Sequence, residues 1–205
     1  MGLDMYLTAE KRLNKNSKVD KQLIEYFDSI DFNEYGADSD GSIYISEYFT
    51  SKAIYDTLST MPKLYGQVGR IKTIVPDGDS YIVRTEAGYW RKANQIHGWF
   101  VNKCQDGIDE CQLTQLEPAQ LTELFNLVSS FGIIPSFRFN KPFIPTPAQM
   151  RLARDILPSE SGFFFGSTEY DEGYFYDIRE TRDILKKVLK PSTINNWKIS
   201  YQSSW

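Results

Sequence analysis

The sequence predicts an α+β fold: a small, mainly antiparallel sheet that includes both terminal strands and a central hairpin, packed with about four or five helices. Two observations place the strands. Both ends of the chain alternate weakly between apolar and polar residues, and residues 68–86 hold two alternating runs around a Pro-Asp-Gly turn. A third observation places the helices, because apolar residues recur at helical spacing in the stretches between these strands.

The first strand is expected at residues 2–7, GLDMYL, which are rich in large apolar groups. A short amphipathic helix should follow Asp20, because apolar residues recur at helical spacing at Leu23, Ile24, Phe27 and Ile30. Residues 31–63 are full of Asp, Ser, Gly and Tyr and are interpreted as loops and short elements. The hairpin then joins residues 68–75 to residues 80–86.

Four helices and the last strand are expected after the hairpin. The first helix follows Gly88 and runs to about Cys104, and the second begins at Pro118, a residue suited to the first helical turn. The third begins with the capping sequence Thr146-Pro147-Ala148-Gln149. The fourth extends over residues 171–189, and the strand WKISYQSSW closes the chain.

Composition and charge argue against several classes of protein, including nucleic-acid-binding, membrane-associated and disulfide-rich proteins. The chain has 205 residues, a formal net charge of −4, and ordinary apolar and charged contents of 41% and 24%. The negative charge argues against general nucleic-acid binding. No secretory signal or apolar stretch of membrane-spanning length occurs, so no membrane association is expected. Two cysteines, Cys104 and Cys111, are too few for a disulfide scaffold or a zinc site, and we expect reduced thiols, no metal and no cofactor.

One stretch partly matches a calcium-binding loop. In GADSDGSIYISE, residues 36–47, Asp38, Asp40 and Glu47 occupy ligand positions of such a loop. The first ligand position is Gly36, however, and a β-rich sequence stands where the exiting helix should begin. The sequence therefore favours a polar turn between two strands.

The only histidine lies in YWRKANQIHGWF, residues 89–100. On a helix, Trp90, Asn94 and His97 would share one face, where Asn and His need hydrogen-bonding partners. Either a structural network or a ligand can satisfy them, and both interpretations stay open. If the protein is an enzyme, His97 would be the general acid or base, with Asp4 or Asp171 as its partner. No common catalytic motif occurs in the chain.

The stretch GFFFGSTEYDEGYFYD, residues 162–177, repeats phenylalanine at adjacent positions. The favoured interpretation is a short buried strand with Phe164 on one face and its two phenylalanine neighbours on the other. The alternative is an aromatic wall that faces a ligand, to which Tyr170 would add surface. Ser167 or Thr168 is expected to cap the helix that follows.

The motifs MGLDMYL, YWRKAN-x-IH-x-WFV and GFFFGST-x-YD, together with the terminal YQSSW, resemble a family of small uncharacterised bacteriophage and prophage proteins. The resemblance leaves residues 8–65 and about 133–146 uncovered. The chain length predicts a single domain over residues 1–205, and the uncovered stretch indicates an insertion at about 8–65. The resemblance implies expression in the cytoplasm of an infected bacterial host.

Within that context the leading hypothesis is a non-enzymatic sponge that sequesters a nucleotide-derived bacterial immune signal. The expected ligand-binding residues are Trp90, Arg91, Lys92, Asn94, His97, Phe164, Ser167, Thr168 and Tyr170. One alternative is an enzyme that degrades such a signal through His97. The other is a protein–protein inhibitor of a host factor, for which exposed aromatic residues within 31–65 would be the sign. Trp205, at the end of the last strand, also favours pairing into a homo-oligomer.

Overall fold

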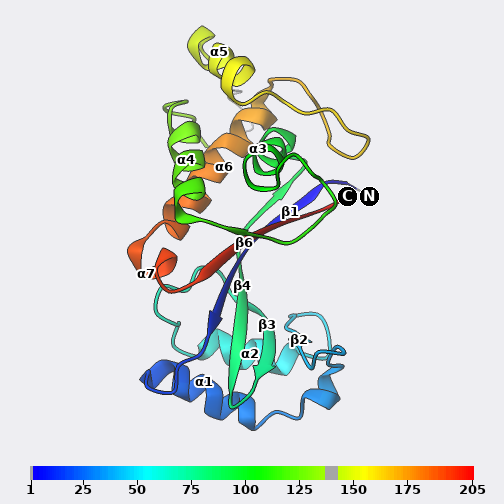
Figure 1. The fold of residues 1–205 in the computed structure, drawn as a ribbon, viewed down its shortest axis with the longest axis vertical. Coiled ribbons are helices and arrows are strands. Elements are labelled where there is room, and N and C mark those ends of the chain that lie inside the picture. The colour runs from blue at the N-terminus through cyan, green and yellow to red at the C-terminus, as the bar shows by residue number, and fades with distance from the viewer. Residues whose placement is uncertain (1, 137–142) are drawn as a thin grey trace. The chain divides into compact units, whose positions relative to one another are not determined.

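The computed structural model describes residues 2–136 and 143–205 of the chain. They form two compact units (Figure 1). Unit 1 contains residues 1–7, 88–190 and 199–205, and unit 2 contains residues 8–87 and 191–198. Unit 2 includes the proposed insertion at about 8–65 and extends beyond it through the hairpin. The single domain with an insertion stays a prediction.

The α+β class and the antiparallel sheet are confirmed, as is the presence of both terminal strands and the central hairpin. The sheet has the strand order β2-β3-β4-β1-β6-β5. Its strands are β1 (Asp4–Arg12), β2 (Ile43–Tyr44), β3 (Ile71–Asp77), β4 (Ser80–Arg91), β5 (Thr114–Leu116) and β6 (Lys198–Ser204). The hairpin pairs Ile74 with Val83 and turns tightly after Asp77.

The described residues contain seven α-helices, slightly more than expected. The two that were not expected, α2 and α7, are short. The helices are α1 (Lys18–Asp28), α2 (Lys52–Thr60), α3 (Asn94–Cys104), α4 (Pro118–Ser129), α5 (Pro147–Ile156), α6 (Glu172–Val188) and α7 (Pro191–Ile194), with a 3₁₀ helix η1 (Phe32–Tyr35). The predicted capping box at Thr146 is confirmed, because its side chain accepts from the Gln149 N–H while the Gln149 side chain accepts from Thr146.

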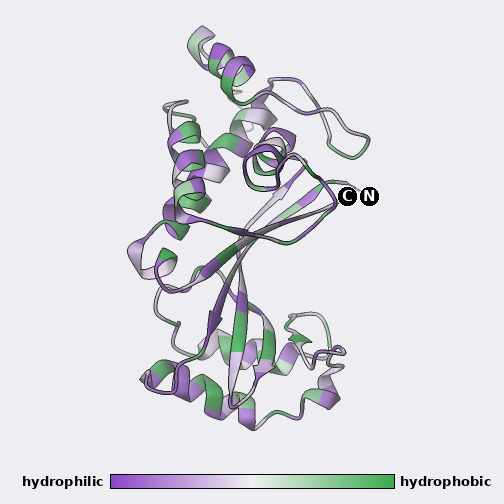
Figure 2. Cartoon of the chain, in the orientation of Figure 1, coloured by the Kyte–Doolittle hydropathy of each residue, from purple (hydrophilic) through white to green (hydrophobic). Residues whose placement is uncertain are grey.

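Each unit has its own core. In unit 1, α6 packs against α3 and α4 and buries one face that includes Phe175, Ile178 and Leu185. In unit 2, Phe27 of α1 contacts the ring of Tyr81 of β4 edge-on, with ring centroids 5.2 Å apart. Figure 2 shows hydrophobic and hydrophilic residues interspersed along both α1 and α6, as an amphipathic helix requires.

The helix predicted to follow Gly88 and run to about Cys104 is wrong in its first third. Strand β4 continues through Arg91, and α3 begins only at Asn94. Between them Lys92 adopts a left-handed conformation with φ 61°, which breaks both regular structures. Trp90 therefore does not share a helical face with Asn94 and His97.

The buried strand predicted for Phe163–Phe165 is also wrong. These residues form a turn closed by a hydrogen bond from the Phe165 N–H to the Gly162 carbonyl, and Phe163 is 96% exposed. Gly166, with φ 89°, gives the chain the left-handed conformation that it needs to leave the turn. Two flanking glycines thus favour a turn over a strand.

Two further expectations concern the cap of α6 and the last strand. Asp171, rather than Ser167 or Thr168, caps α6, since its carboxylate accepts from the Tyr174 N–H. Strand β6 lies between β1 and β5 in the sheet, and β5 covers its residues 199–201, so this part of β6 offers no free edge to a second chain. The homo-oligomer expected from Trp205 stays a prediction.

Candidate functional site

Three of the predicted site residues, Trp90, Asn94 and His97, are buried and bonded within unit 1. The Trp90 indole N–H donates to the Thr181 hydroxyl over 2.9 Å. The Asn94 amide donates to the carbonyls of Phe165 and Ser167, and its oxygen accepts from the Glu160 N–H. The motif thus holds the segment of residues 160–167 in place.

His97 is only 1% exposed and has partners at both ring nitrogens. Its Nδ1 lies 2.7 Å from the Tyr201 hydroxyl, and its Nε2 lies 2.9 Å from Asp109 Oδ2. Burial raises the pKa of Tyr201 well above its usual range, so the phenol keeps its proton and can donate it to Nδ1. Nε2 is then left to donate its proton to Asp109. The ring of Phe165 contacts the imidazole edge-on at 5.0 Å.

This geometry gives His97 a carboxylate partner, Asp109, that sequence spacing did not indicate. Asp4, one of the partners expected for an enzyme, is bonded to Arg91 and Tyr89. Asp171, the other, caps α6. His97 is thus enclosed by a phenol, a carboxylate and an aromatic ring, an arrangement that suits a structural role in the core. Its imidazole is not accessible to a substrate from solvent.

Three other predicted residues, Arg91, Lys92 and Ser167, line a shallow hollow of about 220 Å³ in unit 1. Three carboxylates share this hollow, those of Glu169, Asp171 and Asp177. Burial raises the pKa of Asp177 to about 7, although Gln95, which donates to it over 3.1 Å, opposes that rise. The carboxylates outnumber the cations, so the hollow is poorly suited to phosphate.

The remaining predicted residues, Phe164, Thr168 and Tyr170, do not line that hollow. Phe164 is half-buried and its carbonyl accepts from the Leu3 N–H. The Thr168 carbonyl accepts from the Ser159 hydroxyl. The ring of Tyr170 contacts Tyr174 edge-on at 5.1 Å. The predicted residues are therefore spread over a buried network, a hollow and the exposed turn, and they do not line one cavity.

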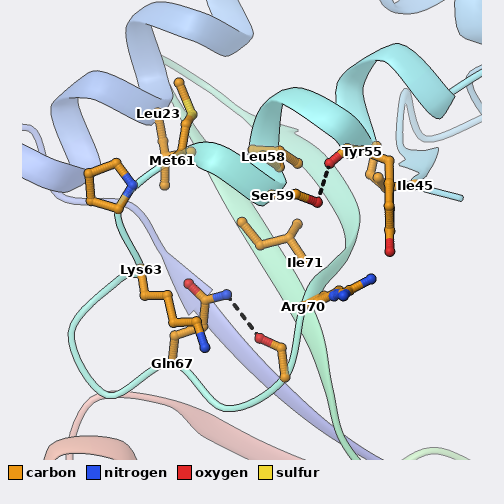
Figure 3. Close-up of a pocket in the computed structure, with 12 residues that line it drawn as sticks. Leu23, Ile45, Tyr55, Leu58, Ser59, Met61, Lys63, Gln67, Arg70 and Ile71 are labelled. Carbon is orange, nitrogen blue, oxygen red and sulfur yellow. Dashed lines mark hydrogen bonds between the residues drawn. The ribbon is translucent and has the colours of Figure 1, made fainter. Parts of the chain in front are cut away.

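A better-formed cavity lies in unit 2, in the part of the chain whose role the sequence left open. It has a volume of about 340 Å³, within the range of small-ligand sites (Figure 3). Its apolar walls come from α1, the chain after β2, α2, the loop that follows α2, and β3: Leu23, Ile45, Leu58, Met61, Pro62 and Ile71.

Polar and charged groups of the same cavity come from Tyr55 and Ser59 of α2 and from the loop of residues 61–70. The Arg70 guanidinium lies 5.3 Å from the centre of the Tyr55 ring. Lys63 also lines the cavity, and in Figure 3 Ile71 lies between Lys63 and Arg70. Among the described residues, no carboxylate lies within ion-pairing distance of either cation, so both charges remain available to an anion.

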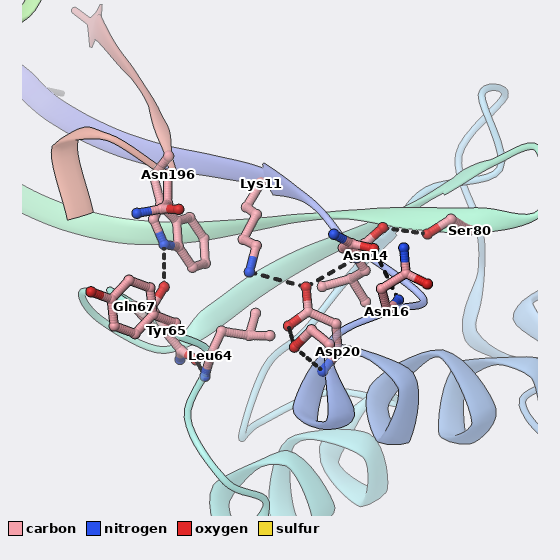
Figure 4. Close-up of polar contacts among 12 residues, drawn as sticks. Lys11, Asn14, Asn16, Asp20, Leu64, Tyr65, Gln67, Ser80 and Asn196 are labelled. Atoms are coloured by element: carbon pink, nitrogen blue, oxygen red, sulfur yellow. Dashed lines mark hydrogen bonds and ion pairs between the residues drawn. The ribbon is translucent and has the colours of Figure 1, made fainter. Parts of the chain in front are cut away.

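The loop of residues 61–70 is held in place by its own bonds and by the segment around α7. Gln67 accepts from the Leu64 N–H and donates to the Gly69 carbonyl. The indole N–H of Trp197 donates to the Tyr65 carbonyl (Figure 4), and Thr193 donates to the Gly66 carbonyl. A loop that is ordered before binding loses less entropy when a ligand arrives.

Comparisons with protein-family models, with curated proteins and with solved structures find no match to this chain. In the described part of the chain, no helix has both the length and the apolar character needed to cross a membrane. Sequence reasoning missed the unit 2 cavity because Tyr55, Lys63 and Arg70 belong to no motif, and the pair Gly66 and Gly69 was the only local sign of an unusual loop.

Proposed function

We propose that this protein is a small-molecule binding protein that sequesters a nucleotide-derived bacterial immune signal, and that the ligand occupies the unit 2 cavity. The observation that carries the proposal is the combination of two cations, Lys63 and Arg70, that have no carboxylate partner among the described residues, with an aromatic ring and an apolar floor. A nucleotide offers matching parts, since its phosphate needs cations and its base needs an aromatic or apolar surface.

Binding without reaction is proposed because of the side chains that line the cavity. None of the lining residues is a histidine, cysteine or carboxylate, the groups that most often move protons or attack substrates. The Ser59 hydroxyl donates to the Tyr55 carbonyl in the helix. The context of an infected bacterial cytoplasm comes from the resemblance to phage proteins and is part of the same proposal.

Native mass spectrometry with a panel of linear and cyclic nucleotides and ADP-ribose tests this proposal. The expected result is an adduct whose mass equals protein plus unmodified nucleotide, lost on denaturation. The double variant Lys63→Gln/Arg70→Gln should weaken binding at least about tenfold, because charge-assisted contacts to phosphate are strong. A matched control, Arg151→Gln/Lys186→Gln, removes two exposed cations outside the cavity and should bind as the unaltered protein does.

Three results would overturn the proposal. Consumption of a nucleotide without an adduct would indicate an enzyme. An adduct retained by the Lys63→Gln/Arg70→Gln variant would place the ligand elsewhere in the molecule. Absence of any adduct across the panel would remove nucleotides as the ligand class.

A further inference from the structure

A second feature of unit 2 is the segment of residues 28–50, here called the acidic–aromatic segment. It adjoins the proposed cavity through Ile45, which lines the cavity, and through Glu47, which accepts from the Tyr55 hydroxyl. It contains six carboxylates and no lysine or arginine: Asp28, Asp31, Glu34, Asp38, Asp40 and Glu47. The whole chain has a formal net charge of −4, so the residues outside this segment are together slightly basic. The negative charge of the protein is thus concentrated in one short stretch.

These six carboxylates are not neutralised by the protein itself. None of them forms an ion pair with a described lysine or arginine. Among the described residues, their hydrogen bonds come from neutral donors, as where Asp28 accepts from the Tyr81 hydroxyl and Asp31 from the Asn33 N–H. Hydrogen bonds from Ser42 lower the pKa of Asp40. The charge of Arg84, which is itself paired with Glu10, also lowers the pKa of Asp40. Because no cation of the described residues lies within ion-pairing distance of these carboxylates, the segment keeps its charge.

Three large rings stand out from the same segment. Tyr44 is 58% exposed, Tyr48 is 82% exposed and Phe49 is 71% exposed, and all three lie within six residues of chain. Single exposed apolar residues are ordinary, but exposed aromatic residues gathered in one short stretch are typical of interaction surfaces. Tyrosine and phenylalanine supply large contact area at a low cost in side-chain entropy.

The backbone that carries these rings is ordered by its own bonds. Strand β2 pairs with β3 and continues into a hydrogen bond from the Ile45 N–H to the Lys72 carbonyl. Beyond it, the Ser46 N–H donates to the Ser51 hydroxyl over 2.8 Å. Before it, the Asp38 N–H donates to the Ser42 carbonyl. The rings and the carboxylates are therefore presented on a formed surface instead of a free chain.

We propose that the acidic–aromatic segment is a docking surface for a protein with an arginine-rich, basic face, of the kind that proteins use to contact nucleic acid. Charge complementarity identifies the partner, because uncompensated carboxylates attract guanidinium groups. The rings add a reason for arginine over lysine, since guanidinium stacks on aromatic faces and pairs with carboxylates in a bidentate manner.

Two other occupants fit this surface poorly. A second copy of the chain joined through a two-fold axis would bring the same carboxylates together, which is unfavourable. Nucleic acid would meet the same repulsion from its phosphates. A basic protein face is the partner whose charge opposes that of the segment.

Fluorescence anisotropy with labelled model peptides tests the inference, using one peptide of alternating arginine and glycine and one of alternating lysine and glycine. The protein should bind the arginine peptide more tightly, and binding should weaken as salt is raised. The variant Tyr48→Ser/Phe49→Ser should weaken binding of the arginine peptide about tenfold. These two rings do not line the unit 2 cavity, so nucleotide binding by this variant should be unchanged.

The charge contribution is tested with matched triple variants. Glu34→Gln/Asp38→Asn/Asp40→Asn keeps the hydrogen-bond acceptors and should weaken binding of the arginine peptide at least about threefold. The control, Glu86→Gln/Asp155→Asn/Glu110→Gln, removes three exposed carboxylates elsewhere and should have little effect. Equal weakening by both triple variants would reduce the effect to net charge and overturn the inference. Unchanged binding by the ring variant, tighter binding of single-stranded DNA than of the peptide, or self-association lost in the ring variant would also overturn it.

Discussion

Substitution of Asn94 by alanine tests whether the central motif is structural. Asn94 is buried and makes three hydrogen bonds, two donated to the carbonyls of Phe165 and Ser167 and one accepted from the Glu160 N–H. At about 1 kcal/mol for each hydrogen bond, Asn94→Ala should lower the free energy of unfolding by about 3 kcal/mol. Urea denaturation followed by tryptophan fluorescence measures this loss directly.

The same variant should release the segment of residues 160–167, because Asn94 joins both ends of it to α3. Limited proteolysis should then cut this segment faster than in the unaltered protein. Asn126, exposed on α4, provides the control, and Asn126→Ala should change stability by less than about 0.5 kcal/mol. A loss below about 1 kcal/mol for Asn94→Ala would refute the structural role and favour the interpretation of Asn94 as a ligand-binding residue.

Three further predictions concern buried charge and backbone space. Although burial raises the pKa of Asp20, hydrogen bonds from the Asn14 N–H and Ser17 and the nearby Lys11 outweigh it, and the pKa is lowered (Figure 4). Its stabilisation is therefore full above the unfolded-state pKa of about 3.9 and is lost as the pH falls through the folded-state value. Asp20→Asn should cost about 3 kcal/mol at neutral pH and flatten the acid limb of a Tm–pH profile; an unaltered limb would contradict this. Burial raises the pKa of Asp177 to about 7, so its stabilisation is full below the unfolded-state value and is lost as the pH rises towards 7. Asp177→Asn should thus reduce the fall in Tm between about pH 5 and about pH 8, and an equal fall in both proteins would argue against it. Gly66 has φ 72°, and a Cβ there would lie within 1.8 Å of the Ser192 carbonyl oxygen, so Gly66→Ala should cost at least about 2 kcal/mol in chemical denaturation. Gly78 also has a positive φ, but a Cβ there would meet open space, so Gly78→Ala should cost only about 1 kcal/mol. Equal losses of stability in the two variants would show that backbone strain, and not the clash with Ser192, determines the cost.

The sequence by itself determined the fold class and most elements. Alternation at the two ends and around Pro76-Asp77-Gly78 depends on neighbouring residues only, and it predicted the presence of both terminal strands and the hairpin. Strands β1 and β4 extend beyond their predicted ends, to Arg12 and Arg91. Caps are equally local, so the helix start at Thr146 was predicted to the residue. The start of α3 was missed, because Trp90 remains in β4 through its sheet neighbours. The bounds of α6 were predicted to within one residue, but its capping residue was missed, because Asp171 competes with two other capping residues.

Only the tertiary structure decided what the motif residues do. Composition could not distinguish a histidine bonded to Tyr201 and Asp109 from one that faces a ligand, because those partners lie 104 and 12 residues away in the chain. The same holds for the cavity in unit 2, where Tyr55, Lys63 and Arg70 become a site only through the folding of the loop between α2 and β3. Local patterns fix elements, whereas burial and the pairing of charges depend on contacts distant in sequence.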